Sequence, residues 1–179
     1  RIRSFAEDRS GNLWIATTRG LSRLDRETGT LSQFRHDPGD PNSLSSDFLS
    51  QVVEDRWGAL WIGTFGDGLD RLDPDTGEAT HYGPDADDPR SLSHARIYSL
   101  LEDRSGTLWI GTDGGGLNRY DREADCFYSY REKDGLPNDV VYGILEDDDG
   151  NLWLSTNGGL SRFDPRAESF RNFDVRDGL

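Results

Sequence analysis

The residues of this chain whose types suit ligand recognition lie in short polar segments between apolar ones. They combine cationic, acidic and amide groups with one aromatic ring, the set that a polyhydroxylated ligand such as an oligosaccharide requires. Because binding groups concentrate in loops held by a rigid scaffold, we predict a ligand site composed of Arg19, Phe65, Asp67, His94, Arg96, Asp113, Asn138 and Asn157. The alternative, that these are ordinary solvated loops, stays open at this point.

Residues for catalysis or metal binding lack the required spacing. The run 147–151 is rich in carboxylates, but the twelfth position from Asp147, where a calcium loop needs a bidentate Glu, is Gly158. We expect that run to be a turn whose carboxylates accept backbone N–H groups. The histidines have no metal-ligand spacing, and no pattern positions a Ser-His-Asp triad. We therefore expect no catalytic residue, no metal ion, no cofactor and no enzymatic activity.

The charge of the chain restricts its partners. The formal net charge is −14, from 34 Asp and Glu against 20 Lys and Arg. Such a surface repels the phosphate backbone of nucleic acids and an anionic membrane leaflet, so we expect neither a nucleic-acid partner nor direct membrane contact. No apolar run reaches the ~20 residues of a membrane span. Cys126 is the only cysteine, so no disulfide can form within the chain.

Four sequence markers recur in one order, and they define the elements that must position the loops. A Leu-Trp pair occurs four times, and successive tryptophans are 47, 48 and 44 positions apart: Trp14, Trp61, Trp109 and Trp153. Each pair is preceded by Glu-Asp and followed by a Leu-x-Arg-x-Asp segment, and an aromatic residue comes nine positions after the Asp of that segment. A period of this length is typical of repeat architectures.

Each repeat is expected to form four short strands, because its segments are β-branched or aromatic and are separated by Gly-containing turns. Four strands in roughly 45 residues match one propeller blade. We therefore predict an all-β fold: one β-propeller array over residues 1–179, with four-stranded blades at roughly 1–42, 43–91, 92–138 and 139–179. The four recurring tryptophans are expected to be structural, packed between blades.

Two further features could serve either recognition or structure. Trp57 lies in a turn where the other repeats have Ser or Asp, so it is either an interaction site or packed on its own hairpin. An arginine recurs at one repeat position, and we expect it to form a structural ion pair with the Asp two residues later. These arginines are Arg23, Arg71, Arg119 and Arg162.

The number of blades leaves ring closure open. Propellers typically hold about four to eight blades, so three arrangements are compatible with four. The chain closes alone, two chains pair into an eight-bladed ring, or the blades contribute to a larger propeller. Because uncovered blade faces and strand edges invite association, we predict that two copies pair as a homodimer.

The repeat has a recognisable pattern, Ile/Val-x-x-Leu/Ile-x-Glu-Asp-x-x-Gly-x-Leu-Trp-Ile-Gly-Thr followed by Gly-Leu-x-Arg-Tyr/Leu-Asp. This pattern resembles the two-component regulator propeller repeat. It is clearest at residues 97–112 with 116–121 and at 141–156 with 159–164, and the linker 134–139 resembles that family's spacing between blades. The first repeat departs modestly, with Ala16 where others have Gly or Ser. In that family the repeats form the periplasmic sensor region of membrane proteins, including hybrid histidine kinases that respond to carbohydrates and some diguanylate cyclases.

The resemblance implies a periplasmic or extracellular location and a non-catalytic, ligand-sensing or interaction module of a bacterial signal-transduction receptor. The implied ligand is carbohydrate-like and binds on the loop face, which we define as the loops between second and third strands together with the linkers between blades. An alternative is a structural or engineered array whose role is self-assembly. A polysaccharide-acting enzyme ranks third.

Overall fold

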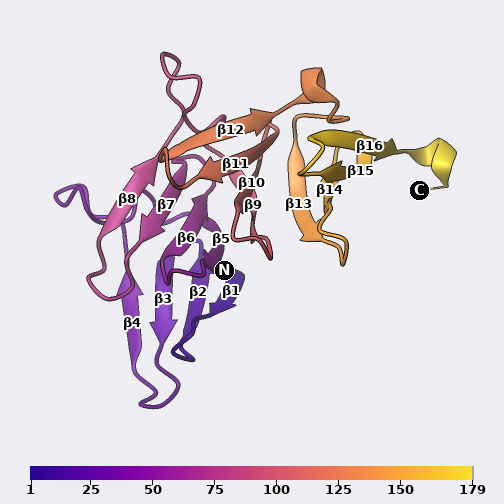
Figure 1. Cartoon of the computed structure of the whole chain (residues 1–179). Coiled ribbons are helices and arrows are strands. Elements are labelled where there is room, and N and C mark those ends of the chain that lie inside the picture. Colours follow the sequence, from indigo (N-terminus) through magenta and orange to yellow (C-terminus); the bar gives the residue numbers. More distant parts are fainter. Residues whose placement is uncertain (179) are drawn as a thin grey trace. The chain divides into compact units, whose positions relative to one another are not determined.

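The computed structural model describes residues 1–178 and confirms the predicted fold class. These residues form four antiparallel sheets of four strands each, joined by loops (Figure 1). Within each sheet the strands follow chain order, so every sheet is a meander and is called a blade below. Two short 3-10 helices, η1 (Glu132–Asp134) and η2 (Val175–Asp177), follow the last strands of blades 3 and 4.

The strands are short, with four to six residues each. Blades 1 and 2 contain β1 (Ile2–Glu7), β2 (Leu13–Thr17), β3 (Gly20–Leu24), β4 (Leu31–Phe34), β5 (Leu49–Glu54), β6 (Leu60–Thr64), β7 (Leu69–Leu72) and β8 (Ala79–Tyr82). Blades 3 and 4 contain β9 (Ile97–Glu102), β10 (Leu108–Thr112), β11 (Leu117–Asp121), β12 (Cys126–Tyr130), β13 (Val141–Glu146), β14 (Leu152–Thr156), β15 (Gly159–Asp164) and β16 (Ser169–Phe173).

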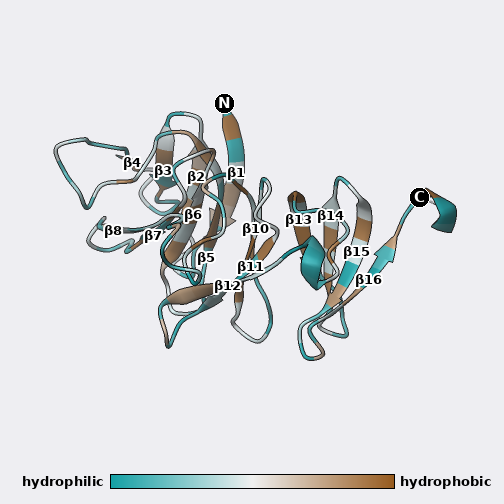
Figure 2. Cartoon of the chain, turned by 90° about the horizontal axis from the view of Figure 1, so that it is seen from above, coloured by the Kyte–Doolittle hydropathy of each residue, from teal (hydrophilic) through white to brown (hydrophobic). Residues whose placement is uncertain are grey.

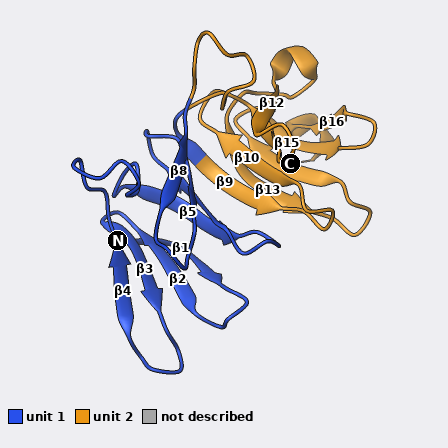
Figure 3. Ribbon diagram, turned by 60° about the vertical axis from the view of Figure 1, so that its left-hand side comes forward, with its two compact units in different colours: residues 1–83, 95–97 blue, residues 84–94, 98–179 orange. Residues whose placement is uncertain are grey.

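The chain divides into two compact units (Figure 3). Unit 1 comprises residues 1–83 with 95–97, and unit 2 comprises 84–94 with 98–179. Hydrophobic residues concentrate on the strands and hydrophilic ones on the loops (Figure 2). Within residues 1–178, no helix has the length and apolar character to cross a membrane.

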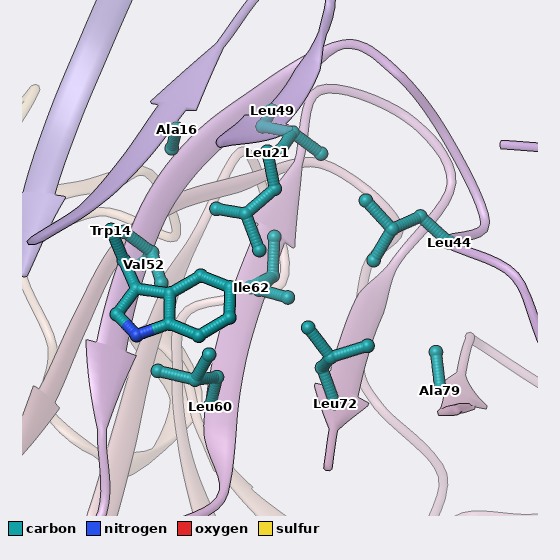
Figure 4. Close-up of a cluster of buried hydrophobic side chains, with 10 residues drawn as sticks. All are labelled: Trp14, Ala16, Leu21, Leu44, Leu49, Val52, Leu60, Ile62, Leu72 and Ala79. Carbon is teal, nitrogen blue, oxygen red and sulfur yellow. The ribbon is translucent and has the colours of Figure 1, made fainter. Parts of the chain in front are cut away.

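The core of unit 1 lies between the sheets of blades 1 and 2 (Figure 4). Trp14 and Leu21 project from blade 1 toward Val52, Leu60 and Ile62 of blade 2. All five side chains are essentially inaccessible to solvent. Because neither sheet could bury this face alone, packing of consecutive blades supplies the hydrophobic stabilisation of the unit.

Unit 2 repeats this arrangement. Trp109 and Leu117 of blade 3 pack with Leu154 and Phe163 of blade 4, and all four are buried. The rings of Trp109 and Phe163 meet edge-on, with centroids 5.6 Å apart, a geometry that aromatic pairs favour. Trp153 is half-buried and stacks on Phe173 of its own blade. Trp14, Trp61 and Trp109 are therefore core residues.

The Glu-Asp marker has a structural role in every blade. The second residue of the pair accepts a hydrogen bond from the indole N–H of the following tryptophan: Asp8 from Trp14, Asp55 from Trp61, Asp103 from Trp109 and Asp147 from Trp153. Its other oxygen accepts two backbone N–H groups of the turn between the first two strands. The turn predicted at 147–151 is thereby confirmed.

The recurring arginines do not form the predicted ion pairs. Each lies directly opposite the recurring tryptophan in the antiparallel pair of second and third strands. The Arg23 guanidinium lies over the Trp14 ring, 5.6 Å from its centroid, and Arg71 lies over Trp61 at 5.8 Å. Within residues 1–178 no ion pair joins any of these arginines to the Asp two positions later, because that Asp accepts N–H groups of the next turn, as Asp25 does.

Candidate ligand site on the loop face

The loop between second and third strands has a rigid backbone that presents variable side chains. In blade 2 the Thr64 hydroxyl donates to the Gly68 carbonyl at 2.9 Å and accepts the Asp67 N–H at 2.8 Å. Gly68 has a φ of +90°, and a Cβ there would lie 2.2 Å from the Tyr82 carbonyl oxygen. Only glycine fits this position without distortion. The recurring Thr and Gly therefore hold the loop, and the residues between them are free to vary.

Unit 1 brings together two of the predicted site residues, Phe65 and Arg96. They form an isolated antiparallel bridge, and Arg96 Nε donates to the Phe65 carbonyl at 3.3 Å. The Phe65 ring lies 5.0 Å from the ring of Phe48, and the Arg3 guanidinium lies 4.6 Å from the Phe65 centroid. We call Arg3, Phe48, Phe65 and Arg96 the arginine–phenylalanine cluster. Its Phe48 side chain is 50% exposed, so an aromatic face is open to solvent.

Arg19 and Asp67 occupy the same kind of loop but stay outside this cluster. Arg19 is exposed in the turn between β2 and β3, where its backbone N–H donates to Thr17 Oγ1 at 2.9 Å. Asp67 is exposed after Phe65. Among residues 1–178, no hydrogen bond or ion pair links either side chain to Phe65 or Arg96.

Unit 2 places one predicted residue, Asn157, beside two tyrosines that the loop analysis missed. Tyr142 Oη donates to Asn157 Oδ1 at 3.1 Å, and its ring stacks on Tyr98 with centroids 5.0 Å apart. Tyr142 is 48% exposed. We call Tyr98, Tyr142 and Asn157 the tyrosine cluster. The sequence feature that indicates this cluster is a difference between repeats. The tyrosines are the second residues of the first strands of blades 3 and 4, where blade 1 has Arg3.

The remaining predicted residues of unit 2 are engaged with the backbone or half-buried. Asn138 Oδ1 accepts the Val140 N–H at 3.0 Å, which shapes the linker before β13. Asp113 forms an isolated bridge with Val140 and is half-buried. His94 is half-buried beside Gly115, whose Cβ, if present, would lie 2.8 Å from that of His94. Asn138 thus helps to shape the linker, and the ligand role of these three residues stays a prediction.

One candidate for acid–base chemistry is a carboxylate–histidine pair in unit 1 that belongs to neither cluster. Asp70 is fully buried and 2.8 Å from His81 Nδ1, while His81 Nε2 is 3.0 Å from the Pro41 carbonyl. Burial raises the pKa of Asp70, although hydrogen bonds from His81 and Ser45 oppose the rise. Both ring nitrogens of His81 are occupied, so the pair ties β7 and β8 to the linker before β5 and offers no free base. In the described part of the chain, no group of three or more His, Cys, Asp or Glu is arranged to hold a metal ion.

The two clusters therefore present groups that can contact a ligand. Exposed rings stack on apolar faces of a ligand, and arginine and amide groups donate and accept hydrogen bonds. This is the chemistry expected for a hydroxyl-rich ligand.

Comparison with known proteins agrees with the repeat and the fold. The family model described as two component regulator propeller matches residues 1–19, 91–114 and 135–158. No curated protein sequence matches the chain. The extracellular domain of a hybrid two component system from B. thetaiotaomicron superposes with a TM-score of 0.86 at 24% identity, over 97% of this chain and 24% of that one. Virginiamycin B lyase from Staphylococcus aureus superposes with a TM-score of 0.72 at 16% identity, over 99% of this chain and 56% of that one. The chain thus spans about a quarter of the first protein and about half of the second.

Proposed function

Because the chain carries repeats of the two component regulator propeller family, we propose that it is an extracytoplasmic ligand-sensing module of a signal-transduction receptor. The ligand is carbohydrate-like and binds on the loop face without being cleaved. The observation that carries the proposal is the pair of solvent-open aromatic clusters at positions that differ between repeats, each with hydrogen-bonding groups in contact. On the loop face the shared residues build the scaffold, so recognition there falls to the residues that are not shared.

The fold relatives support this location and role to different degrees. One is the extracellular part of a signalling protein and another is a lyase, and a propeller by itself carries either kind of function. The site favours binding, because the arginine–phenylalanine and tyrosine clusters contain rings, guanidinium groups and an amide but no carboxylate–histidine pair. A polysaccharide-acting enzyme would require turnover, and an assay of a glycan panel tests that alternative directly.

Thermal unfolding in the presence of neutral oligosaccharides tests the proposal. A ligand at 100-fold its dissociation constant stabilises the native state by about 2.7 kcal/mol, a clear rise in the unfolding temperature. We expect Phe65→Ala and Tyr142→Ala to weaken binding about tenfold, because a stacking face is lost. Thr28→Ala, in an exposed turn between β3 and β4, is the matched control. If no oligosaccharide raises the unfolding temperature at millimolar concentration, the proposal is wrong.

A second role, self-assembly, is favoured by one observation. Phe5 is 60% exposed on β1, whereas the equivalent Val52 and Leu100 are 1% and 3% exposed. The outer face of blade 1 is thus apolar and uncovered, as association requires.

A further inference from the structure

Each unit contains a groove between its two blades, on the side of the turns that join first and second strands. The groove of unit 1 has a volume of about 570 Å³ and is lined by Arg9, Arg23, Glu54, Trp57 and Arg71 among others. The groove of unit 2 has about 540 Å³ and is lined by the equivalent Arg104, Arg119, Glu146 and Asp149. Because the grooves arise from the same repeat positions, differences between them show what each is adapted to.

In unit 2 the arginine of the groove is paired. Arg119 Nη1 lies 3.7 Å from Glu168 Oε1, and the same oxygen accepts a hydrogen bond from Tyr130 Oη at 2.6 Å. Glu168 is in the turn between β15 and β16 and has a left-handed backbone, with φ of +49°. A carboxylate of the chain thus lies within ion-pair distance of the guanidinium of this groove.

In unit 1 the equivalent carboxylate is missing. Gly77, with φ of +78°, occupies the position of Glu168, and Phe34 occupies that of Tyr130. Arg23, the counterpart of Arg119, forms no hydrogen bond and no ion pair with any of residues 1–178, and its Nε is buried without a partner. A buried donor that has lost contact with water and gained no acceptor is destabilising. The Arg23 guanidinium thus lies over the Trp14 ring and has no carboxylate partner among residues 1–178.

The carboxylates around this groove have other partners or lie at its rim. Glu54 accepts the Arg9 N–H at 3.0 Å, and Asp8 accepts the Trp14 indole N–H. Asp73 accepts two N–H groups of its own turn. Asp75 and Glu78 are exposed at the rim. None of these carboxylates forms an ion pair with Arg23.

Trp57 adds an aromatic surface to the groove of unit 1. Its side chain is 56% exposed, and the Arg56 guanidinium lies 5.7 Å from its ring centroid. The corresponding turn residue of the unit 2 groove is Asp149. The groove of unit 1 thus contains an indole ring and the guanidinium of Arg23, which has no ion pair. The groove of unit 2 has a carboxylate in place of the ring, and its Arg119 is paired.

We propose that the groove of unit 1 binds a saccharide that carries a carboxylate, that is, a uronic acid unit. The ligand carboxylate pairs with Arg23 as the Glu168 carboxylate pairs with Arg119, and the sugar ring packs on Trp57. Arginine favours a carboxylate through its planar set of donors, and an indole offers the apolar surface for the ring. This site is separate from the loop face and does not depend on the proposed function.

Calorimetric titration with an oligogalacturonate and with a neutral galactose oligomer of equal length tests the proposal. We expect the native protein to bind the acidic oligomer at least tenfold more tightly. Arg23→Gln should abolish that preference, and Trp57→Ala should weaken both ligands. Gly77→Glu should prevent binding, because it reproduces the internal pair of unit 2. Arg119→Gln, in the other groove, is the matched control and should bind like the native protein.

Three outcomes would overturn the assignment. The native protein shows no preference for the acidic oligomer, Arg23→Gln and Arg119→Gln change affinity equally, or acetate displaces the oligomer at equal concentration, which would reveal a site for any small anion. Thr28→Ala, in the exposed turn between β3 and β4, is a second control and should leave oligogalacturonate binding unchanged. Unfolding temperatures of all variants show whether each is folded, and Arg23→Lys, which keeps the charge without the planar donors, should give intermediate affinity.

Discussion

Trp14 Nε1 donates a hydrogen bond to Asp8 Oδ2 at 2.8 Å, and this contact joins the first turn of blade 1 to its core. The other carboxylate oxygen of Asp8 accepts the N–H groups of Ser10 and Asn12. One carboxylate thus closes the turn and satisfies the only polar atom of a fully buried indole. The six-residue spacing between Asp and Trp in all four blades follows from this geometry.

Replacing Asp8 by Asn should destabilise the protein by about 1–3 kcal/mol at pH 7. The amide has the shape of the carboxylate but one fewer acceptor, so either the indole or a turn N–H loses its partner. Denaturation by guanidinium chloride, followed by tryptophan fluorescence, measures the change. Asp75→Asn, at an exposed turn position, should leave the free energy of unfolding unchanged. Equal midpoints for Asp8→Asn and the native protein would contradict the role of this contact.

The same contact should make stability depend on pH. Burial raises the pKa of Asp8, but hydrogen bonds from Asn12, Trp14 and the turn amides together outweigh it, and the folded pKa lies below the ordinary 3.8. A depressed carboxylate pKa stabilises the fold above the unfolded pKa, and this stabilisation is lost as the pH falls through the folded value. The free-energy difference between native protein and Asp8→Asn should therefore be constant from pH 7 to about pH 5 and shrink below 3.8. A difference that persists unchanged to pH 2.5 would refute it.

The repeat could be predicted from the sequence because its determinants are local. The Asp–Trp contact spans six residues, and the glycines of the loops have conformations that only glycine adopts readily, so both leave fixed spacings. The arginine contacts could not be predicted in the same way. Arg23 and Asp25 recur together in the repeat, which predicts an ion pair, but Trp14 lies directly opposite Arg23 on the neighbouring strand and contacts the guanidinium.

The candidate site was predictable only in part, for a related reason. Phe65 and Arg96 were identified because they differ between repeats, but their contact depends on chain segments 31 residues apart. Tyr98 and Tyr142 lie within strands, so a prediction restricted to loops and linkers does not include them. The groove of unit 1 depends on Gly77, which has no side chain to pair with Arg23. This feature is recognised only by comparison with Glu168, which occupies the same repeat position in unit 2.

Removing His81, the partner of buried Asp70, should lower the free energy of unfolding more than replacing both residues by another hydrogen-bonded pair. His81→Ala leaves a fully buried carboxylate without its ring partner and should destabilise the protein by about 3 kcal/mol or more at pH 7. The double variant Asp70→Ser/His81→Asn reproduces Ser161 and Asn172, which are bonded at 2.6 Å in blade 4, and should recover most of the loss.

The dependence of this effect on pH has a defined sign. Burial raises the pKa of Asp70 above its ordinary value. The ionised carboxylate therefore destabilises the folded state above the folded pKa, and this cost disappears as the pH falls through the folded pKa and Asp70 is protonated. The deficit of His81→Ala should therefore be largest at neutral pH and smaller in acid. Urea denaturation at several pH values measures it. A double variant as unstable as His81→Ala would show that the pair is not the cause.

Contacts between consecutive blades identify the residue that tests pairing of two chains. Arg9 Nη2 of blade 1 donates to the Asp55 carbonyl of blade 2 at 2.7 Å, and Arg104 Nη1 of blade 3 donates to the Asp147 carbonyl of blade 4 at 3.2 Å. The equivalent residue of blade 4 is Asp148, whose side chain is fully exposed. If blade 4 packs on blade 1 of a second copy in the same way, Asp148 lies next to Glu7 and Asp8 of that copy. In the two interfaces within the chain, an arginine occupies the position of Asp148.

Substitution of Asp148 by Arg should therefore strengthen a homodimer. A restored exposed pair contributes about 1 kcal/mol, or roughly a fivefold lower dissociation constant. Phe5→Glu should dissociate the dimer, because it places a charge in the apolar face that the partner covers. Light scattering across a concentration series gives the mass, expected to rise toward twice the 20.1 kDa of one chain. A mass of one chain for both the native protein and Asp148→Arg at every concentration would exclude pairing through these faces.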